Sequence, residues 1–291
     1  MLVDFHVHST ASDGTFAPSE VVRKAKGFAA VALTDHDNCD GIAEFVGGGA
    51  AGAAPFLVPG IELSIEPGEG FDNFHLLGLG IDPENAELKA LLKSVLDGRN
   101  ARNERIIANF RRLGMEMAEG AGASTVFSYA HGEVLARPHF ARWLVDHGRA
   151  PDVRAAFATY LQSDSPRETR CYEDRWHPSQ EDAFRAIHAA GGLCVMAHPK
   201  YWRTDWKTTG PDFAAAEREL AVLKEKGLDG VEALYQANTN EENVGFLRMA
   251  KRLGFLMTAG SDFHGANRPA IPLGMEVSES FAGPVLERLR G

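Results

Sequence analysis

Short apolar runs alternate with helical patterns along the first third of the chain. Four runs of aliphatic, β-branched and aromatic residues predict strands, at residues 2–8, 29–37, 54–66 and 74–81. Residues 18–27 predict a helix, with Pro18 near its start and Gly27 at its end, and the Ala- and Gly-rich stretch 41–54 predicts another. Strands that alternate with helices indicate an α/β protein with a parallel sheet or barrel.

The pattern becomes mostly helical between residues 84 and 190, where apolar residues recur at helical spacing. Two shorter helices are expected there, at 137–148 and 152–162. Arg99, Arg102 and Arg105 lie in this stretch, and we interpret them as part of a solvent-exposed helix face.

The alternation of predicted strands and helices then resumes. Three further strands are predicted at 193–198, 230–235 and 255–264, with helices at 179–190, 212–226 and 240–253. The sequence therefore predicts a barrel built from residues 1–83 and 191–291, with a mostly helical insert or cap at 84–190 that contributes to substrate binding.

Composition narrows the class of protein. The chain has 291 residues, 44% of them hydrophobic, and 40 Asp and Glu against 30 Lys and Arg. This acidic balance disfavours binding of long nucleic acid, which needs cationic side chains to displace counterions. The three widely spaced cysteines, with no CxxC pair, indicate reduced thiols and a cytoplasmic location. No signal-peptide pattern and no membrane-spanning apolar run is recognised.

Side chains that bind metals gather at the ends of the predicted strands. His6 and His8 stand two apart on the first strand, so both point to the same face. Asp13 lies just past this strand, and six further residues lie at or beside the ends of other strands; they are His36, Glu62, His75, His198, Asp262 and His264. In a parallel barrel the carboxyl ends of the strands meet at one rim, where active sites lie. The chain has 11 histidines, and all six outside the insert belong to this set.

The sequence blocks around these residues resemble the PHP family, named for polymerase and histidinol phosphatase. The blocks are DFHVHSTASDG, ALTDHD, GIELS, the single His of FHLLGLG, MAHP and GSDFHG, and they cover residues 2–81 and 193–265. The resemblance implies a distorted (β/α)₇ barrel of α/β class and a site for two or three divalent metal ions. Members of the family use zinc, manganese or iron.

The resemblance also implies a ligand for each ion. His6, His8, Glu62 and Asp262 would hold the first metal. Glu62 would bridge to the second, together with His75 and His198, and the third would be held by Asp13, His36 and His264. Because a carboxylate at Asp13 is a hard ligand, Mn²⁺ is favoured over Zn²⁺ or Fe²⁺.

Clustered cations predict phosphoester hydrolysis. They lower the pKa of a bridging water and neutralise charge that develops on a phosphoryl group, so hydroxide would attack phosphorus in line. Glu62, His198 and Asp262 are the expected catalytic residues. Asp4 and Asp35 are candidates for orienting imidazole N–H groups, although strand-edge charges explain them equally well.

Three further residues are expected to contact the substrate. Arg137 and His139 lie in RPHFAR, a block that is similar to one in the nucleotide-handling members of the family, where an arginine of the insert reaches the substrate phosphate. Lys200 follows His198 and Pro199 directly. An ordinary helix start with Pro138 in its first turn would also explain the first pair.

The expected substrate is a small phosphate ester, either a nucleoside 3′,5′-bisphosphate or a phosphorylated or cyclic-phosphate ribose. Three alternatives stay open. They are a 5′-end-trimming exonuclease on short oligonucleotides, an amidohydrolase-type C–N hydrolase and a non-catalytic binding module. The sequence does not fix the oligomeric state.

Overall fold

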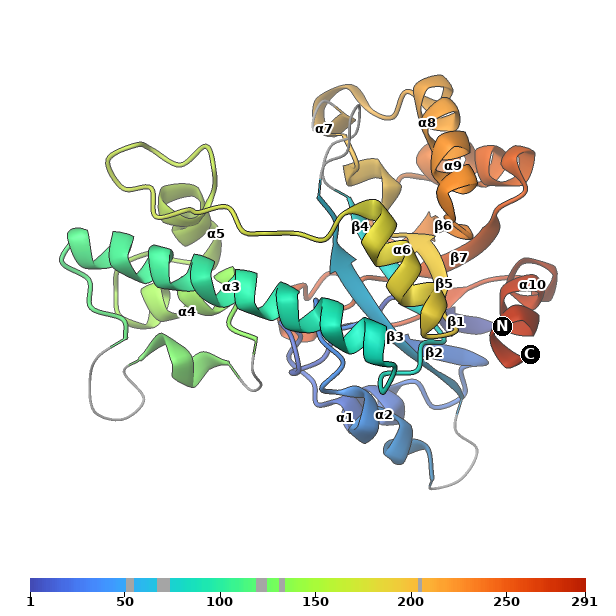
Figure 1. Cartoon of the computed structure of the whole chain (residues 1–291), viewed down its shortest axis with the longest axis horizontal. Coiled ribbons are helices and arrows are strands. Elements are labelled where there is room, and N and C mark those ends of the chain that lie inside the picture. The colour runs from blue at the N-terminus through green and yellow to red at the C-terminus, as the bar shows by residue number, and fades with distance from the viewer. Residues whose placement is uncertain (51–54, 67–73, 119–124, 131–133, 204–205) are drawn as a thin grey trace. The chain divides into compact units, whose positions relative to one another are not determined.

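The structure is a computed structural model, and it describes residues 1–50, 55–66, 74–118, 125–130, 134–203 and 206–291. The chain divides into two compact units, which we describe separately (Figure 1). The barrel unit comprises Met1–Leu92 and His177–Gly291, and the helical unit comprises Lys93–Trp176. A contribution of the helical unit to substrate binding stays a prediction.

The barrel unit is built on one eight-stranded sheet. Its strands are β1 (Leu2–Asp4), β2 (Ala30–Leu33), β3 (Phe56–Ser64), β4 (His75–Leu79), β5 (Leu193–Met196), β6 (Gly230–Tyr235), β7 (Leu256–Gly260) and β8 (Met275–Glu276). They are ordered β7-β6-β5-β4-β3-β2-β1-β8. The first seven correspond to the seven strands expected from the sequence. The two-residue β8 is too short for an apolar pattern to reveal it.

Two backbone hydrogen bonds join β1 and the residues after it to β7 and the residues after it. The N–H of Phe5 donates to the carbonyl of Ala259 at 3.0 Å, and the N–H of His8 donates to the carbonyl of Phe263 at 3.0 Å. The sheet is thus a nearly closed barrel, and the expected α/β barrel class is confirmed.

One strand departs from the expected parallel arrangement. β4 runs antiparallel to both β3 and β5, whereas β1, β2 and β3 are parallel, as are β5, β6 and β7. β8 is antiparallel to β1. Only residues 65–74 separate β3 from β4, whereas parallel neighbours need a crossover of about a dozen residues or more, so an antiparallel pairing is favoured.

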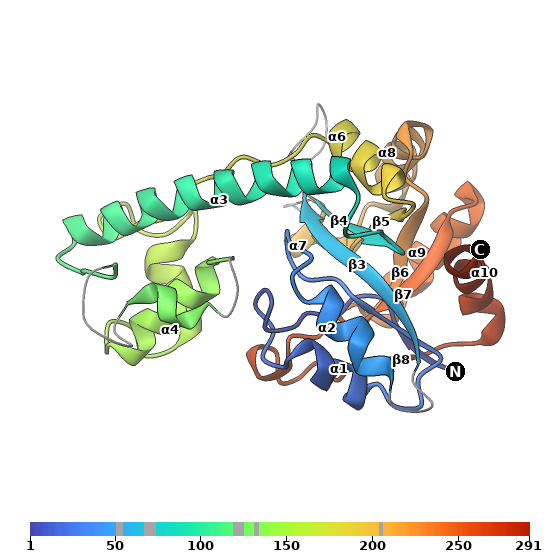
Figure 2. The same cartoon turned by 60° about the horizontal axis from the view of Figure 1, so that its bottom comes forward.

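Helices cover the outside of the sheet (Figures 1 and 2). They are α1 (Pro18–Lys24), α2 (Ile42–Gly47), α6 (Gln180–Ala189), α7 (Trp206–Thr209), α8 (Phe213–Lys226), α9 (Asn240–Leu253) and α10 (Glu279–Arg290). In both views α1 and α2 lie together beside β2 and β3, and both termini lie near α10. Residues 51–54 of the helix expected at 41–54 lie outside the described residues.

Local sequence signals set the helix ends. The hydroxyl of Thr239 accepts from the N–H of Glu242 at 3.2 Å, and the Glu242 carboxylate accepts from the N–H of Thr239 at 2.7 Å. This capping box begins α9, and Gly254, in the left-handed region with φ 66°, ends it.

The helical unit contains most of α3 (Ala86–Arg112), α4 (Arg137–Asp146) and α5 (Val153–Ala156), followed by a π-helical turn at Phe157–Leu161. Its own core includes Phe110, Phe140 and Leu144. One expectation is wrong here: Arg99 and Arg102 are only 6% and 4% exposed, so this face of α3 is not solvated. Arg105 is exposed, as expected.

Among the described residues, no helix combines the length and apolar character needed to cross a bilayer.

Candidate metal centre

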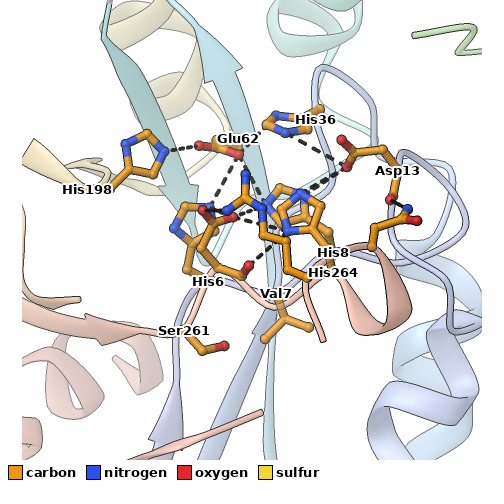
Figure 3. Close-up of polar contacts among 12 residues, drawn as sticks. His6, Val7, His8, Asp13, His36, Glu62, His198, Ser261 and His264 are labelled. Carbon is orange, nitrogen blue, oxygen red and sulfur yellow. Dashed lines mark hydrogen bonds and ion pairs between the residues drawn. The ribbon is translucent and has the colours of Figure 1, made fainter. Parts of the chain in front are cut away.

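The nine expected metal ligands converge at one rim of the barrel. Figure 3 shows His6, His8, Asp13, His36, Glu62, His198 and His264 at this rim. The parallel strands β1, β2, β5 and β7 each deliver residues just after their carboxyl ends, and β3 delivers Glu62 near its end. In each of four overlapping groups, the candidate donor atoms lie within 4.8 Å of one another. The groups are His8, Asp13, His36 and His264; His6, Glu62 and His198; His6, His8 and Asp262; and His36, Glu62 and His75.

The reversal of β4 explains why its first residue joins this set. His75 pairs with Ser64, the last residue of β3, in the antiparallel register. The amino end of β4 therefore lies at the same rim as the carboxyl ends of the parallel strands.

Glu62 lies among the imidazoles and is fully buried. Its Oε2 lies 3.3 Å from Nε2 of His6, 3.2 Å from Nε2 of His8 and 2.9 Å from Nδ1 of His36. Two ligand atoms each about 2.1 Å from one cation lie roughly 3–3.5 Å apart. These separations therefore suit ligands that share an ion.

The other oxygen of Glu62 faces two different imidazoles. Oε1 lies 2.8 Å from Nδ1 of His75 and 3.0 Å from Nε2 of His198. One carboxylate thus faces two sets of imidazoles through its two oxygens, which is the arrangement that a bridging ligand requires.

Two more carboxylates extend the cluster. Oδ1 of Asp262 lies 3.3 Å from Nε2 of His8 and 3.3 Å from Nδ1 of His264. Oδ1 of Asp13 lies 3.1 Å from Nε2 of His264 and 3.9 Å from Nε2 of His36.

Several atoms of this cluster are buried without a hydrogen-bond partner among the described residues. They are His6 Nε2, both ring nitrogens of His8, Asp13 Oδ1, Glu62 Oε2 and His264 Nε2. A buried polar atom left without a partner is costly, so native proteins rarely contain one. Imidazole and carboxylate atoms left this way suit divalent cations, and the residues present therefore fit a metal centre.

The charges within the cluster are strongly coupled. Burial alone would raise the pKa of Glu62, but the imidazoles of His36 and His6 hold it well below its ordinary value. Burial lowers the pKa of His8, but the adjacent carboxylates of Asp262 and Glu62 outweigh this effect and raise it to about 9. Without cations, the carboxylates are thus ionised and His8 is protonated at neutral pH.

Glu232 is a site residue that sequence reasoning missed. It is fully buried on β6; its Oε1 lies 3.1 Å from Nδ1 of His6, and its Oε2 accepts from the N–H of His198 at 2.7 Å. By engaging Nδ1, it leaves Nε2 of His6 facing the centre. A glutamate in the middle of an apolar strand was the available signal, because an isolated charge is almost never buried there.

Gly260 makes this contact possible. A Cβ on this residue would lie 1.9 Å from Oε1 of Glu232 and 2.5 Å from Cβ of His6. Any larger side chain would therefore push the glutamate from the imidazole.

Asp262 is held through its second oxygen by two residues that were also missed. The hydroxyl of Tyr235 donates to Oδ2 at 2.9 Å, and Arg268 donates to the same oxygen.

Asp262 and His198 both have positive φ, 57° and 26°, in a region that non-glycine residues rarely adopt. Such strain is typical of functional sites.

Asp4 and Asp35 hold loops and not imidazoles. Asp4 accepts from the N–H and hydroxyl of Ser261, at 3.0 and 2.6 Å. Asp35 accepts from the N–H and hydroxyl of Ser9, at 2.8 and 2.6 Å. Neither carboxylate contacts an imidazole ring within the described part of the chain, so the expectation that they orient these rings is not met, and they act on the rim by ordering its loops.

The residues expected to contact substrate have other partners in the structure. Nζ of Lys200 donates to the carbonyl of Ala237 and to Glu242, both at 2.9 Å. In the helical unit, Nδ1 of His139 accepts from the N–H of Ala136 at 3.0 Å, at the start of α4, and Arg137 donates to the carbonyl of Leu161 at 3.3 Å. Their roles toward substrate stay predictions.

A nearly closed α/β barrel with clustered imidazoles and carboxylates at one rim defines a class of metal-dependent hydrolases. Residues 4–162 match the PHP domain, and similarity to curated relatives extends over 90% of the chain. The chain therefore belongs to the PHP family, and the resemblance seen in its sequence blocks is confirmed.

Three curated relatives show the range of activities around this chain. A 3′,5′-nucleoside bisphosphate phosphatase of Chromobacterium violaceum is 36% identical over 90% of this chain and 87% of the relative. A 5′-3′ exoribonuclease of Haemophilus influenzae is 33% identical over 90% and 89%. A phosphoribosyl 1,2-cyclic phosphate 1,2-diphosphodiesterase of Eggerthella lenta is 30% identical over 91% and 95%. Each of these three enzymes acts on a phosphate ester.

Two solved structures share the fold over nearly the whole chain. A protein of Chromobacterium violaceum described as an amidohydrolase, with bound sulfate and no metal, has a TM-score of 0.81 at 31% identity, covering 99% of this chain and 96% of that one. A protein of Bifidobacterium adolescentis assigned as a metal-dependent phosphoesterase has a TM-score of 0.78 at 26% identity, covering 98% and 96%.

Proposed function

We propose that this protein is a metal-dependent phosphoesterase that hydrolyses a small phosphorylated metabolite, with a nucleoside 3′,5′-bisphosphate as the first candidate substrate. The observation that carries the proposal is the rim at which Glu62 lies within 3.3 Å of five imidazoles. The relatives named above support the substrate class.

The proposed ligand set is the nine residues expected from the sequence. His6, His8 and Asp262 would hold one ion, His75 and His198 a second, and Asp13, His36 and His264 a third, with Glu62 between the first two. Bound divalent ions would supply Lewis acidity and a water of lowered pKa. We favour Mn²⁺, because the rim contains three carboxylates and no thiolate among the described donors.

The chain's own residues position these groups. Glu232 fixes the ring of His6 and the backbone of His198, so both imidazoles face the rim. Tyr235 and Arg268 hold one oxygen of Asp262 and leave the other toward His8. With one oxygen held in this way, Asp262 is a suitable group to receive or return a proton during turnover.

Release of inorganic phosphate from a nucleoside 3′,5′-bisphosphate, measured with Mn²⁺ present, tests the proposal. The matched control is the corresponding 5′-monophosphate. Turnover of the bisphosphate with release of one phosphate is expected. No phosphate release from bisphosphates or from cyclic and linear phosphoribose esters would contradict the proposal.

A second candidate is 5′-end trimming of short oligonucleotides, which the similarity to exoribonucleases favours. Competition between a bisphosphate and a 5′-phosphorylated oligonucleotide separates the two by comparing kcat/KM. Because one similar structure is described as an amidohydrolase, an amide substrate belongs in the same screen. Turnover of the amide without any phosphate ester would favour C–N hydrolysis.

We also propose a cytoplasmic location. The structure has free thiols at all three cysteines, Cys39, Cys171 and Cys194, which suits a reducing compartment.

A further inference from the structure

A second group of metal-binding side chains lies in the barrel unit, away from the rim. It consists of His188, Cys194 and Asp229, and we call it the thiol cluster. One donor atom of each residue lies within 4.8 Å of the donor atoms of the other two. Imidazole, thiolate and carboxylate are the three kinds of side chain that bind zinc in proteins.

The thiol cluster lies at the opposite end of the barrel from the metal centre. Cys194 is the second residue of β5, and Asp229 directly precedes β6, so both are at the amino ends of parallel strands. His188 is near the end of α6, which packs against β5 (Figure 1). Because the rim is formed at the carboxyl ends of these strands, an ion bound here shares no ligand with the rim.

Hydrogen bonds fix Cys194 and Asp229 relative to each other. The N–H of Asp229 donates to the carbonyl of Cys194 at 2.8 Å, and the N–H of Cys194 donates to Oδ2 of Asp229 at 2.8 Å. The same Oδ2 lies 2.8 Å from Nε2 of His188. The three residues are therefore held close together before any ion binds, which reduces the conformational cost of binding.

An ion pair at the surface explains only part of this arrangement. The side chains of His188 and Asp229 are 40% and 28% exposed, and a pair of this kind contributes little to stability. Cys194 is fully buried, and its thiol donates a long hydrogen bond of 3.8 Å to the carbonyl of Phe184. The cluster thus has a buried sulfur on one side and solvent on the other, so an ion can enter without disruption of the core.

The charges of the thiol cluster suit a divalent ion. Burial and the nearby carboxylate of Asp229 raise the pKa of Cys194 well above its ordinary value, so the thiol is protonated in the ion-free protein. When the sulfur binds an ion, its proton leaves to solvent. A thiolate, a carboxylate and a neutral imidazole then carry two negative charges, which neutralise a divalent cation in this partly buried place.

We propose that His188, Cys194 and Asp229 bind a zinc ion that joins the end of α6 to the amino ends of β5 and β6. Thiolate sulfur favours zinc over Mn²⁺, whereas the carboxylates of the rim favour Mn²⁺, so the two sites select different metals. A water molecule completes the coordination from the solvent side. The zinc ion stabilises the barrel, and this role does not depend on the activity proposed above.

Cobalt spectroscopy of the full chain tests the ligand set. Co²⁺ bound to a thiolate absorbs strongly in the near ultraviolet, and the nine rim residues supply no sulfur. Titration of the wild type with Co²⁺ should produce this band, and Cys194→Ala should lack it. Cys39→Ala and Cys171→Ala are the matched controls and should keep the band. A wild type without the band, or Cys194→Ala with it, would overturn the proposal.

A variant at the exposed ligand keeps the test decisive if the change at the buried Cys194 impairs folding. His188→Gln should weaken Co²⁺ affinity, measured from the same band, by at least about tenfold, since loss of a ligand exceeds the usual effect of altering a group that orients one. His147→Gln, which changes an exposed histidine of the helical unit, should bind Co²⁺ like the wild type. Equal affinity of His188→Gln and the wild type contradicts the assigned ligands.

Anomalous diffraction locates the ion directly. Crystals of the full chain with Mn²⁺ bound are soaked in Zn²⁺, and data are collected on both sides of the zinc absorption edge. A zinc peak is expected about 2.3 Å from Sγ of Cys194. Zinc peaks at the rim alone, or none, count against the proposal.

Thermal unfolding measures the stabilising role. Zn²⁺ should raise the melting temperature of the wild type more than that of His188→Gln, because an ion that binds only the folded state stabilises it. The rim is the same in both proteins, so the difference between the two shifts belongs to the thiol cluster. Equal shifts would show that zinc does not stabilise the barrel through this cluster.

Discussion

The rim of the barrel unit and the arginine cluster of the helical unit both bury charge, but they do so in opposite ways. At the rim, Glu62, Asp13 and Asp262 alternate with imidazoles, and each donor atom lies about 3–4 Å from a group of different character. Arg102 is 4% exposed, and burial together with the guanidiniums of Arg99, Arg137 and Arg175 lowers its pKa. A mixed set of carboxylates and imidazoles suits cations, whereas a set of like positive charges does not, so the composition of a buried cluster limits the ligands that it can bind.

Removal of metal should have the largest effect. Treatment with a chelator is expected to reduce phosphate release to background, because the rim residues alone do not supply Lewis acidity. Adding Mn²⁺ back should restore turnover.

Asp262→Asn should reduce turnover by about 10²–10⁴-fold, the usual contribution of a positioned acid or base, together with a loss of metal affinity. The amide cannot accept a proton, and its N–H₂ group would face the imidazoles or Arg268. Steady-state kinetics and metal content by atomic emission measure both effects. A variant with full activity would show that the ligand assignment is wrong.

Glu232→Gln should reduce metal affinity or turnover by about 10–100-fold, the usual effect of altering a group that orients a ligand. Gly260→Ala should act in the same direction, because its Cβ would clash with the Glu232 carboxylate. Metal titration of the apo-protein checks both variants. Glu241→Gln, which changes an exposed glutamate of α9, is the matched control and should behave as the wild type.

The smallest expected effect is the pH dependence of metal binding. The pKa of His8 in the metal-free protein is about 9, so the ring must lose a proton to bind a cation near neutrality. Affinity should rise about tenfold per pH unit between pH 7 and 8 for each proton released. Metal affinity that is flat or falls with pH would contradict the assigned protonation of His8.

Metal binding should also reduce the contribution of this proton to stability. In the apo-protein the raised pKa of His8 contributes stability that is complete below the ordinary pKa of 6.5 and is lost as pH rises through about 9. Denaturant titrations of apo-protein at pH 7 and pH 9 measure this loss, and in the metal-loaded protein the difference should be smaller.

The seven strands and the nine rim residues could be predicted because strand-end positions carry a local signal. A histidine or carboxylate directly after an apolar run is visible in a single sequence, and parallel strands bring such residues together. The direction of β4 was not visible, since residues 74–81 have the same apolar pattern in either direction.

Among the supporting residues only Glu232, a charged residue within an apolar strand, carried a signal in the sequence. Glu232 lies inside a strand, and Arg268 and Tyr235 are single polar residues whose contact with Asp262 exists only after the chain has folded. The arginines of α3 were wrongly interpreted because helical spacing gives the relative direction of side chains and not what packs over them. Burial of that face depends on α4 and the segment near Tyr172, far away in sequence.

The contact between β1 and β7 has a consequence for biosynthesis. His6 and His8 leave the ribosome more than two hundred residues before Asp262 and His264, which directly follow β7, the strand that closes the barrel. A growing chain cannot assemble the full set of donors before β7 has joined β1. Ion loading is therefore a late event in the maturation of this protein, and a chain that stops before residue 262 cannot retain the complete cluster.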